Sequence, residues 1–565
     1  MSGSVKHITM LLLSIYLIVS ITSCKRVETE PRDWIREDLV WDEKDLNATV
    51  AGFFLNSVYS YIPSGFNRIG GDYLDAASGD AIPSRNNQTV EYYTNGQISV
   101  LNNPDPYWAS SYAGVRAANI FLSNIDRVPM AAQTKRYWKA EARYVRALMY
   151  FELLKRYGGI PLVGNKVLTV DDKLELPRNS YADCVNYIVN ECDAIKDSLR
   201  LETGANYTTS DWGRIAKGAA IALKCRTYLY AASPLFNGGA VEGDLAKKIL
   251  TSYPAYDVNR WQLVVNAAQE LIGLNYYALN SSFGNVFTVN KNTEVILSKQ
   301  GATNFSVETN NAPVGFSNPV SFGRTSPTAQ FVNAFPMNNG LAITAAGSGY
   351  NAQSPYTNRD PRLALTVFYN GYKWLNRNIQ TYDGGLDKPG GSVVQTKTGY
   401  YLRKFMADFS SNTAYSNQYH NFVLFRYAEV ILNYAEALNE LGRTEDAVAQ
   451  LILIRKRAGI LAGTNNRYGV PSGISQTDFR VLLQNERRIE LAFEEHRFWD
   501  IRRWKTAPDV LNGSLSGTKI TLNGTVLNFQ DVNVATVSFS NKLYHMPLPY
   551  DEVIKNNQLI QNEGW

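Results

Sequence analysis

Apolar side chains recur at every third or fourth position over long stretches of this chain, and that spacing predicts amphipathic helices. The pattern is clearest in residues 135–157, where one apolar stripe runs without a break. Gly158, Gly159 and Pro161 follow this stripe and mark the end of the helix. The stripe consists of Trp138, Ala142, Val145, Met149 and Leu153. Helices are also expected at 47–62, 108–125, 180–199 and 213–233.

A second group of helices is expected in the C-terminal part of the chain, at 425–459 and 478–505. The first of these stretches carries small and large residues at most of the positions typical of a tetratricopeptide helix pair. These positions are Ala435, Leu438, Gly442, Ala447 and Leu451, whereas Ile454 stands where the last small residue is usual. The fold class is therefore expected to be mainly α, built on a tetratricopeptide-like helical-repeat scaffold.

Two regions break the helical period. Residues 63–107 are rich in Gly, Asn, Asp, Ser and Pro, and predict a long loop. Residues 276–425 alternate short apolar runs with polar links, and predict irregular loops with a few short strands. Long loops inside a compact domain are usually functional or disordered. We therefore interpret residues 276–425 as a large loop-rich, ligand-binding insertion in the helical scaffold.

The composition narrows the class of protein. Of the 565 residues, 45% are hydrophobic and 19% are charged, as is typical of a globular chain with a buried core. The net charge of +5 is small for this length and argues against nucleic acid as a partner. Cys184 and Cys192 lie in one predicted helix, about 12 Å apart along its axis, which is too far for a disulfide bond.

The first residues have the pattern of an export signal. Lys6 and His7 precede an apolar run, and the small residue Ser23 stands directly before Cys24. The run is too short to span a membrane and has the flanks of a cleaved signal. Because Ile-Thr-Ser-Cys is similar to a bacterial lipobox, Cys24 is the expected lipid-attachment residue. An ordinary signal peptide that ends near a cysteine is the alternative.

The densest charged motif lies in residues 486–504 and contains carboxylates at intervals of four residues. Carboxylates on one helix face beside arginines more often form ion pairs than a catalytic pair, so an ion-pair network is expected. The residues are Glu486, Glu490 and Glu494 with Arg487, Arg497 and Arg502. No sequence motif of a zinc, nucleotide or serine-hydrolase site is present. A carboxylate-only calcium site in the loop 72–80 stays open as an alternative.

Seven segments stand out in order along the chain: 140–163, 213–237, 327–340, 358–363, 425–442, 486–505 and 544–565. Together they resemble the SusD-like (RagB/SusD) family of outer-membrane nutrient-binding lipoproteins. The lipobox at Cys24 is also typical of that family.

The resemblance implies a fold and a role. The fold would be an α-helical scaffold of four tetratricopeptide-like units with one loop-rich face that binds ligand. The protein would sit at the cell surface, anchored by lipid in the outer membrane, and would partner a SusC-like TonB-dependent transporter. It would act there as a hinged lid that captures an oligosaccharide and delivers it into the barrel. No bond would be made or broken, so the protein is not expected to be an enzyme and needs no cofactor.

The expected organisation follows from these patterns. Its parts are a signal peptide at 1–23, a lipidated tether at 24–45, an N-terminal helical region at 46–275 with a binding loop at 63–107, the insertion at 276–425, and a C-terminal helical region at 426–565.

The first candidate binding loop is residues 70–96. Sugar recognition uses aromatic faces against the C–H face of the sugar ring, and carboxylate, amide or guanidinium groups for its hydroxyls. This loop offers both kinds of group. The candidate ligand-binding residues are Asp75, Asp80, Arg85, Tyr92 and Tyr93.

The second candidate loop is residues 369–385, which contributes Trp374, Arg377 and Tyr382. An exposed Trp in a loop rich in Gly and Asn is costly unless a ligand or partner covers it. The alternative is that Trp374 and the tyrosines pack the loop onto the scaffold. For function as a whole, two alternatives also stay open. One is the same role with peptide cargo, and the other is a surface glycoside hydrolase, which would need two carboxylates about 5–10 Å apart in a cleft.

Overall fold

A computed structural model of the chain describes residues 37–565, except for 206, 317–320 and 412–414. The predicted signal peptide, Cys24 and the tether up to residue 36 lie outside the described residues. Across the described ranges, no helix combines the length and the apolar character that a membrane crossing requires.

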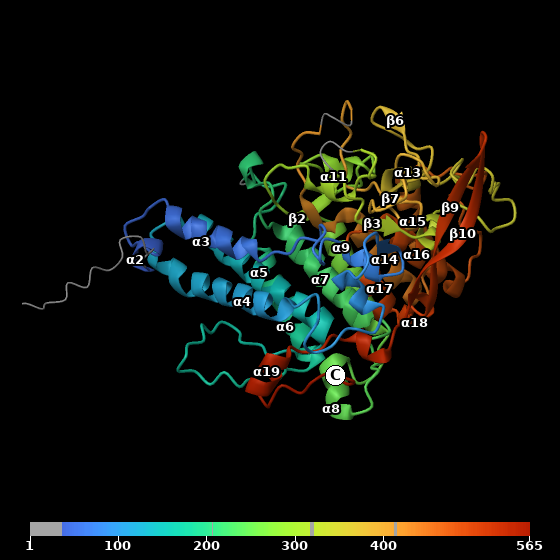
Figure 1. The fold of residues 1–565 in the computed structure, drawn as a ribbon. Helices are drawn as coiled ribbons and strands as arrows, with labels where there is room; N and C mark the ends of the chain where they lie inside the picture. The colour runs from blue at the N-terminus through green and yellow to red at the C-terminus, as the bar shows by residue number, and fades with distance from the viewer. Residues whose placement is uncertain (1–36, 206, 317–320, 412–414) are drawn as a thin grey trace, which may run out of the picture.

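The N-terminal half is a series of packed helices, which Figure 1 shows as a layered arm leading into the body of the molecule. α4 packs on α5, α5 on α6, α6 on α7, and α7 on α9. The helices and turns are α2 (Glu37–Val40), α3 (Thr49–Ser60), η1 (Leu74–Ala77), η2 (Thr89–Tyr93), α4 (Tyr107–Asn124), η3 (Ile125–Arg127), α5 (Ala132–Tyr157), α6 (Tyr181–Lys196), η4 (Thr209–Asp211), α7 (Lys217–Ala232), α8 (Leu245–Thr251) and α9 (Asn259–Ile272).

The predicted apolar stripe of α5 is confirmed. Ala142, Val145, Met149 and Leu153 are buried, and Trp138 is half-buried. The helix ends at Tyr157 because Gly158 adopts a φ of +76°, and a Cβ there would lie 2.6 Å from the carbonyl oxygen of Leu250. Only glycine therefore fits this turn.

The C-terminal helices pack against the same body. α14 (Tyr427–Glu440) contacts α9 on one side and α15 (Thr444–Ala458) on the other. The tetratricopeptide-like interpretation is confirmed, because the predicted positions form the buried interface of this helix pair. The buried residues are Ala435, Leu438, Ala447, Leu451 and Ile454. Gly442 makes the connecting turn with a φ of +77°.

The predicted helix 478–505 is two helices. α16 (Gln476–Glu490) and α17 (Arg497–Arg503) are separated by a bend in which Phe493 and Glu495 have positive φ values of 59° and 62°. The remaining short helices of this region are α18 (Ala507–Val510), η5 (Asn541–Tyr544) and α19 (Tyr550–Lys555).

One element of the expected C-terminal helical region is not helical. β9 (Gly513–Asn523) and β10 (Val526–Val537) form an antiparallel hairpin that projects along one edge of the molecule (Figure 1). Its turn contains Gly524, with a φ of +61°. Asn-Gly before an alternating run is a strong hairpin signal, so the sequence carried the information that the helical interpretation missed.

The insertion is confirmed as loop-rich with short elements. Its strands pair two by two, β2 with β8, β4 with β7 and β5 with β6. The elements are α10 (Asn285–Thr288), β2 (Val295–Lys299), α11 (Ser306–Asn311), β3 (Thr325–Pro327), α12 (Ala329–Ala334), α13 (Pro361–Thr366), β4 (Val367–Phe368), β5 (Lys373–Trp374), β6 (Arg377–Asn378), β7 (Tyr401–Leu402) and β8 (Phe422–Arg426). A separate aromatic core that includes Phe316, Phe331, Phe368 and Tyr401 holds them together.

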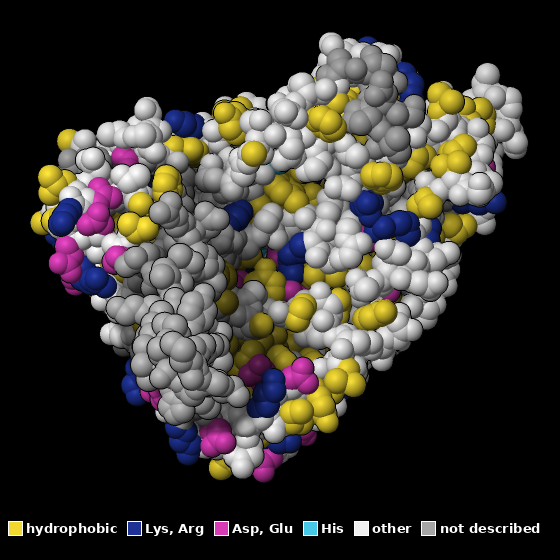
Figure 2. Space-filling model, turned by 60° about the vertical axis from the view of Figure 1, so that its left-hand side comes forward, with side chains coloured by type: hydrophobic (Ala, Val, Ile, Leu, Met, Phe, Trp, Pro, Cys, Tyr) yellow, Lys and Arg dark blue, Asp and Glu magenta, His cyan; other side chains and the backbone are white. Residues whose placement is uncertain are grey.

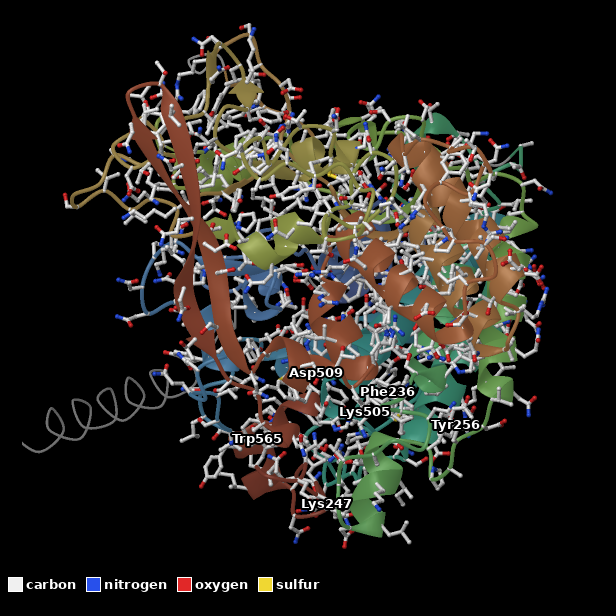
Figure 3. The ribbon with its side chains drawn as sticks, turned by 90° about the vertical axis from the view of Figure 1, so that its right-hand side faces the viewer. Phe236, Lys247, Tyr256, Lys505, Asp509 and Trp565 are labelled. Carbon is white, nitrogen blue, oxygen red and sulfur yellow. The ribbon has the colours of Figure 1, made fainter. Side chains whose placement is uncertain are left out.

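The chain end returns to the helical body. Trp565 lies on the side of the molecule that carries α8 and α18, where Figure 3 labels it with Lys247 and Asp509. Its indole N–H donates to the carbonyl oxygens of Lys542 and His545, at 3.2 and 3.0 Å. The last residues are therefore held in place.

A buried ion-pair network joins the insertion to α16 and the bend that follows it. Arg362 binds Glu486 at 2.6 Å and Glu490 at 2.8 Å, and Arg426 binds Glu490 and Glu494 at 2.7 Å each. All five side chains are almost fully buried. The network continues through Glu294, Asp360, Lys404, Arg455 and Arg457. The structure thus confirms that the glutamates of this motif form an ion-pair network.

The partners within the network differ from those expected. Arg487 and Arg502 are expected to pair with the glutamates of this motif. Arg487 instead contacts the side chains of Asn433 and Asp500, at 2.6 and 3.3 Å, and Arg502 donates hydrogen bonds to backbone oxygens. Burial raises the pKa of Glu490, but the surrounding guanidinium groups outweigh this effect and hold its pKa below the ordinary value. Glu490 therefore remains ionised at neutral pH.

Replacing Arg362 by Met is expected to lower the free energy of unfolding by ~3–5 kcal/mol, because three buried carboxylates then lose a partner. Arg443→Met is the matched control, since Arg443 is largely exposed beside Asp446 and its loss should cost less than ~1 kcal/mol. Urea unfolding of both variants at pH 7 measures the difference. Equal midpoints for the two variants would contradict a structural role for the network.

Candidate functional site

The first predicted binding loop and the insertion form one continuous surface. β1 (Ala81–Pro83) of the loop pairs antiparallel with β3 of the insertion, with Ala81 opposite Pro327. Lys397, further along the insertion, donates to the backbone oxygen of Arg85 at 3.0 Å. Segments far apart in sequence are therefore brought together. We call the surface around Arg85 and Lys397 the face.

Two predicted ligand-binding carboxylates lie beneath the face. Asp80 is buried and binds Arg488 at 2.6 Å, with Arg497 3.7 Å away. Asp75 is also buried and accepts a hydrogen bond from the backbone N–H of Phe493 at 3.1 Å. Burial, with Asp80 nearby, raises the pKa of Asp75 to about 8. Both carboxylates tie the loop to α16 and the bend after it.

Two predicted aromatic residues are also buried. The expectation of an exposed Trp374 is wrong, because only 1% of this residue is exposed and its ring packs 4.8 Å from those of Phe316 and Phe368. Tyr93 packs against Phe498, with ring centroids 5.1 Å apart, and donates its hydroxyl hydrogen to Asn103. The packing alternative therefore describes both rings.

Arg377 and Tyr382 hold the second loop in shape. Arg377 forms two bonds of 2.8 Å with the carboxylate of Asp387, and its guanidinium group lies 3.8 Å from the centroid of the Phe316 ring. Tyr382 donates to the side chain of Gln380 at 3.2 Å. Both residues are only partly exposed.

Arg85 and Tyr92 remain partly exposed, and Tyr92 packs part of its ring against the helical core. The guanidinium group of Arg85 binds Asp72 at 3.1 Å and the backbone oxygen of Gly70 at 3.2 Å. Asp72 is fully buried and also accepts a hydrogen bond from Thr325 of the insertion. Burial raises the pKa of Asp72 to about 6, although the charge of Arg85 acts in the opposite direction.

The structure adds cationic residues that the sequence interpretation missed. A Cβ atom on Gly71 would lie 2.6 Å from Nη1 of Arg324 and 3.1 Å from Nη2 of Arg85, so both guanidinium groups border the same point. Together with Lys397, which contacts the backbone of Arg85, they form a group that we call the basic cluster: Arg85, Arg324 and Lys397.

An exposed aromatic ring lies beside the basic cluster. Phe322 is 43% exposed, and the guanidinium group of Arg324 lies 4.9 Å from its ring centroid. Figure 2 gives a separate view of one side of the molecule, on which hydrophobic side chains line a hollow and both basic and acidic side chains lie around it. A Phe-Gly-Arg run in a polar loop was the available sequence signal for this part of the site.

The arrangement offers binding groups rather than an acid–base pair. Glu486, Glu490 and Glu494 are all held in the buried network. For the calcium alternative, no group of three or more His, Cys, Asp or Glu side chains suited to a metal occurs within 37–565 as described. Asp72 and Asp80 are instead paired with arginines.

Two family models match the chain over most of its length. Residues 44–229 match the one described as "Starch-binding associating with outer membrane", and residues 293–565 match that of the SusD family. Among curated relatives, a SusD-like protein from Formosa agariphila is 24% identical over 595 residues, which cover 98% of either chain. A SusD-like protein from Bacteroides ovatus is 32% identical over 156 residues, 26% of this chain and 27% of the relative.

Solved structures share the fold. A SusD-like protein from Bacteroides fragilis has a TM-score of 0.77 and 24% identity, and the match covers 95% of this chain and 100% of that one. A structure described as a laminarin-binding SusD-like protein has a TM-score of 0.62 and 20% identity, covering 92% and 99% of the two chains. The chain therefore belongs to the SusD-like (RagB/SusD) family, as its helical segments and their order predicted.

Proposed function

We propose that this chain is a cell-surface glycan-binding lipoprotein that captures oligosaccharides and delivers them, as a lid, to a SusC-like TonB-dependent outer-membrane transporter. Membership of the SusD-like family is the observation that carries the proposal. Similar folds include the laminarin-binding protein and a surface glycan-binding protein from Bacteroides fluxus, with a TM-score of 0.61 and 18% identity.

The chemistry of the face supports a sugar ligand. Phe322 and Tyr92 offer aromatic surface, and Arg85 and Arg324 offer donors for hydroxyl or acidic oxygens. The loop that carries Tyr92 is anchored from below by Asp75 and Asp80. A ligand would therefore meet a preformed surface and would lose little free energy to ordering of the protein.

The transporter role rests on the family resemblance and on the predicted lipid anchor at Cys24. An anchored protein that binds sugars at modest affinity gains effective concentration when it is held beside the transporter. Binding in the micromolar range, about −8 kcal/mol, would then be sufficient for capture and would still permit release.

Tyr92→Ala is expected to weaken oligosaccharide binding about tenfold, because an aromatic surface beside the ligand is lost. Isothermal titration of the mature, unlipidated chain against oligosaccharides of varied linkage measures the effect. Tyr550→Ala is the control, since Tyr550 is 47% exposed on α19. Trp374→Ala is unsuitable as a test of binding, because it would open a cavity in the aromatic core.

Other outcomes of the titration distinguish the alternatives. If the chain binds peptides and no sugar, the cargo in our proposal would change from oligosaccharide to peptide, and the lid role would stand. Shortened products after incubation with a polysaccharide would establish a hydrolase instead. Equal sugar affinities for the Tyr92 and Tyr550 variants would exclude Tyr92 from the site.

Cys24→Ser is expected to release the protein from the outer-membrane fraction, because the thiol that carries the lipid is absent. Fractionation of cells that express either form, with palmitate labelling, measures this. Unchanged labelling and membrane association in the variant would show that Cys24 is not the attachment residue.

Deletion of the gene for this chain is expected to abolish growth on the oligosaccharide that binds in titration, and to leave growth on free monosaccharide unchanged. Growth curves of the deletion and complemented strains measure the effect. Uptake of the labelled oligosaccharide at the original rate in the deletion strain would contradict the delivery role.

A further inference from the structure

The basic cluster carries more positive charge than its neighbours balance. Arg85 has one carboxylate partner, Asp72. Arg324 donates its Nε–H to the amide oxygen of Asn310 at 2.7 Å, and Lys397 donates to a backbone oxygen. Within the described part of the chain, neither Arg324 nor Lys397 lies within ion-pair distance of a carboxylate.

Burial makes this imbalance costly. Asp72 is the carboxylate in contact with the cluster. It is fully buried and already accepts hydrogen bonds from Arg85 and Thr325. Burial and the neighbouring charge of Arg85 lower the pKa of Arg324, and burial lowers the pKa of Lys397. Cations in such surroundings are stabilised by an added anion more than solvated surface cations are.

The acidic groups that face the cluster are too few to neutralise it. Besides Asp72, Glu91 lies close enough to influence Lys397, so two carboxylates face the three cations of the cluster. Positive charge therefore remains for a ligand to balance.

We infer that the sugars this face takes are acidic oligosaccharides, whose carboxylate or sulfate groups bind at Arg85, Arg324 and Lys397. The inference rests on the proposed glycan-binding function and names the class of glycan. The guanidinium group of Arg324 lies 4.9 Å from the centroid of the Phe322 ring. Phe322 would contact the sugar ring, and Arg324 would face the acidic group of the sugar.

The positive φ of Gly71 is consistent with this use of the face. Gly71 has a φ of +94°, which residues with side chains rarely adopt, and a Cβ there would push the guanidinium groups of Arg324 and Arg85 aside. Gly71 thereby leaves the two groups free to border one point, where a planar carboxylate or a sulfate would meet both.

The test compares ligands that differ only in charge. The mature, unlipidated chain is titrated with oligogalacturonides and their methyl esters, with a sulfated galactan oligosaccharide and its desulfated form, and with neutral laminari-oligosaccharides. The charged member of at least one pair is expected to bind about tenfold or more tightly than its neutral counterpart, which corresponds to one charge-assisted contact. The two pairs distinguish carboxylate from sulfate.

Variants locate the effect. Arg324→Gln and Lys397→Gln are each expected to weaken binding of the preferred acidic ligand about tenfold, and Arg324→Lys is expected to recover part of the loss. Lys373→Gln is the control, because Lys373 is an exposed cation of β5 in the same insertion. Thermal unfolding of each variant checks that the fold is retained.

The outcomes separate the two proposals. Equal binding of the charged and neutral members of both pairs would overturn the acidic-ligand inference and leave glycan binding standing. Acidic binding that Lys373→Gln weakens as much as Arg324→Gln does would remove the basic cluster from the site and overturn the inference as well. No binding to any sugar would overturn glycan binding and, with it, the acidic-ligand inference.

Discussion

The buried ion-pair network is the interaction on which the arrangement of the molecule depends. Arg362 comes from the insertion and Arg426 ends β8 directly after it, whereas Glu486, Glu490 and Glu494 come from α16 and the bend after it. Charges removed from water are tolerated only when each one meets a partner, so the network permits one placement of the insertion on the helices. The paired strands of the insertion are too small to be stable alone, and the network with its aromatic core compensates for this.

The same principle shapes the loop that carries Arg85 and Tyr92. Asp75 and Asp80 reach below it to α16 and the bend, while β1 pairs with β3 of the insertion. The polar residues of this loop therefore divide into two groups, one that anchors the loop and one that remains available at the face. Binding surfaces on loops work best when a rigid scaffold positions them, and this loop is fixed from two sides.

The fold of this protein depends on packing throughout the chain, whereas ligand binding depends on a few side chains. The helical scaffold is shared with solved structures at 24% identity or less, which shows that many sequences satisfy its packing. In our proposal, the class of ligand depends instead on a few side chains, the three cations near Asp72 and the ring of Phe322. A shared fold does not by itself fix the ligand, so the charge of this face is the property to test.

The sequence by itself determined most of the long helices, the helix pair at 425–459 and the ionic character of residues 486–504, but neither α9 nor the break between α16 and α17. These features depend on the spacing of apolar and charged residues a few positions apart, because the geometry of a helix places such residues on one face. The hairpin of β9 and β10 was equally local but was missed. Only the tertiary structure decided that Trp374 is buried, that Glu490 meets Arg362, and that Arg85, Arg324 and Lys397 converge. Glu490 and Arg362 are 128 positions apart, and Lys397 and Arg85 are 312 apart. Chain packing, which no local period encodes, brings such residues together.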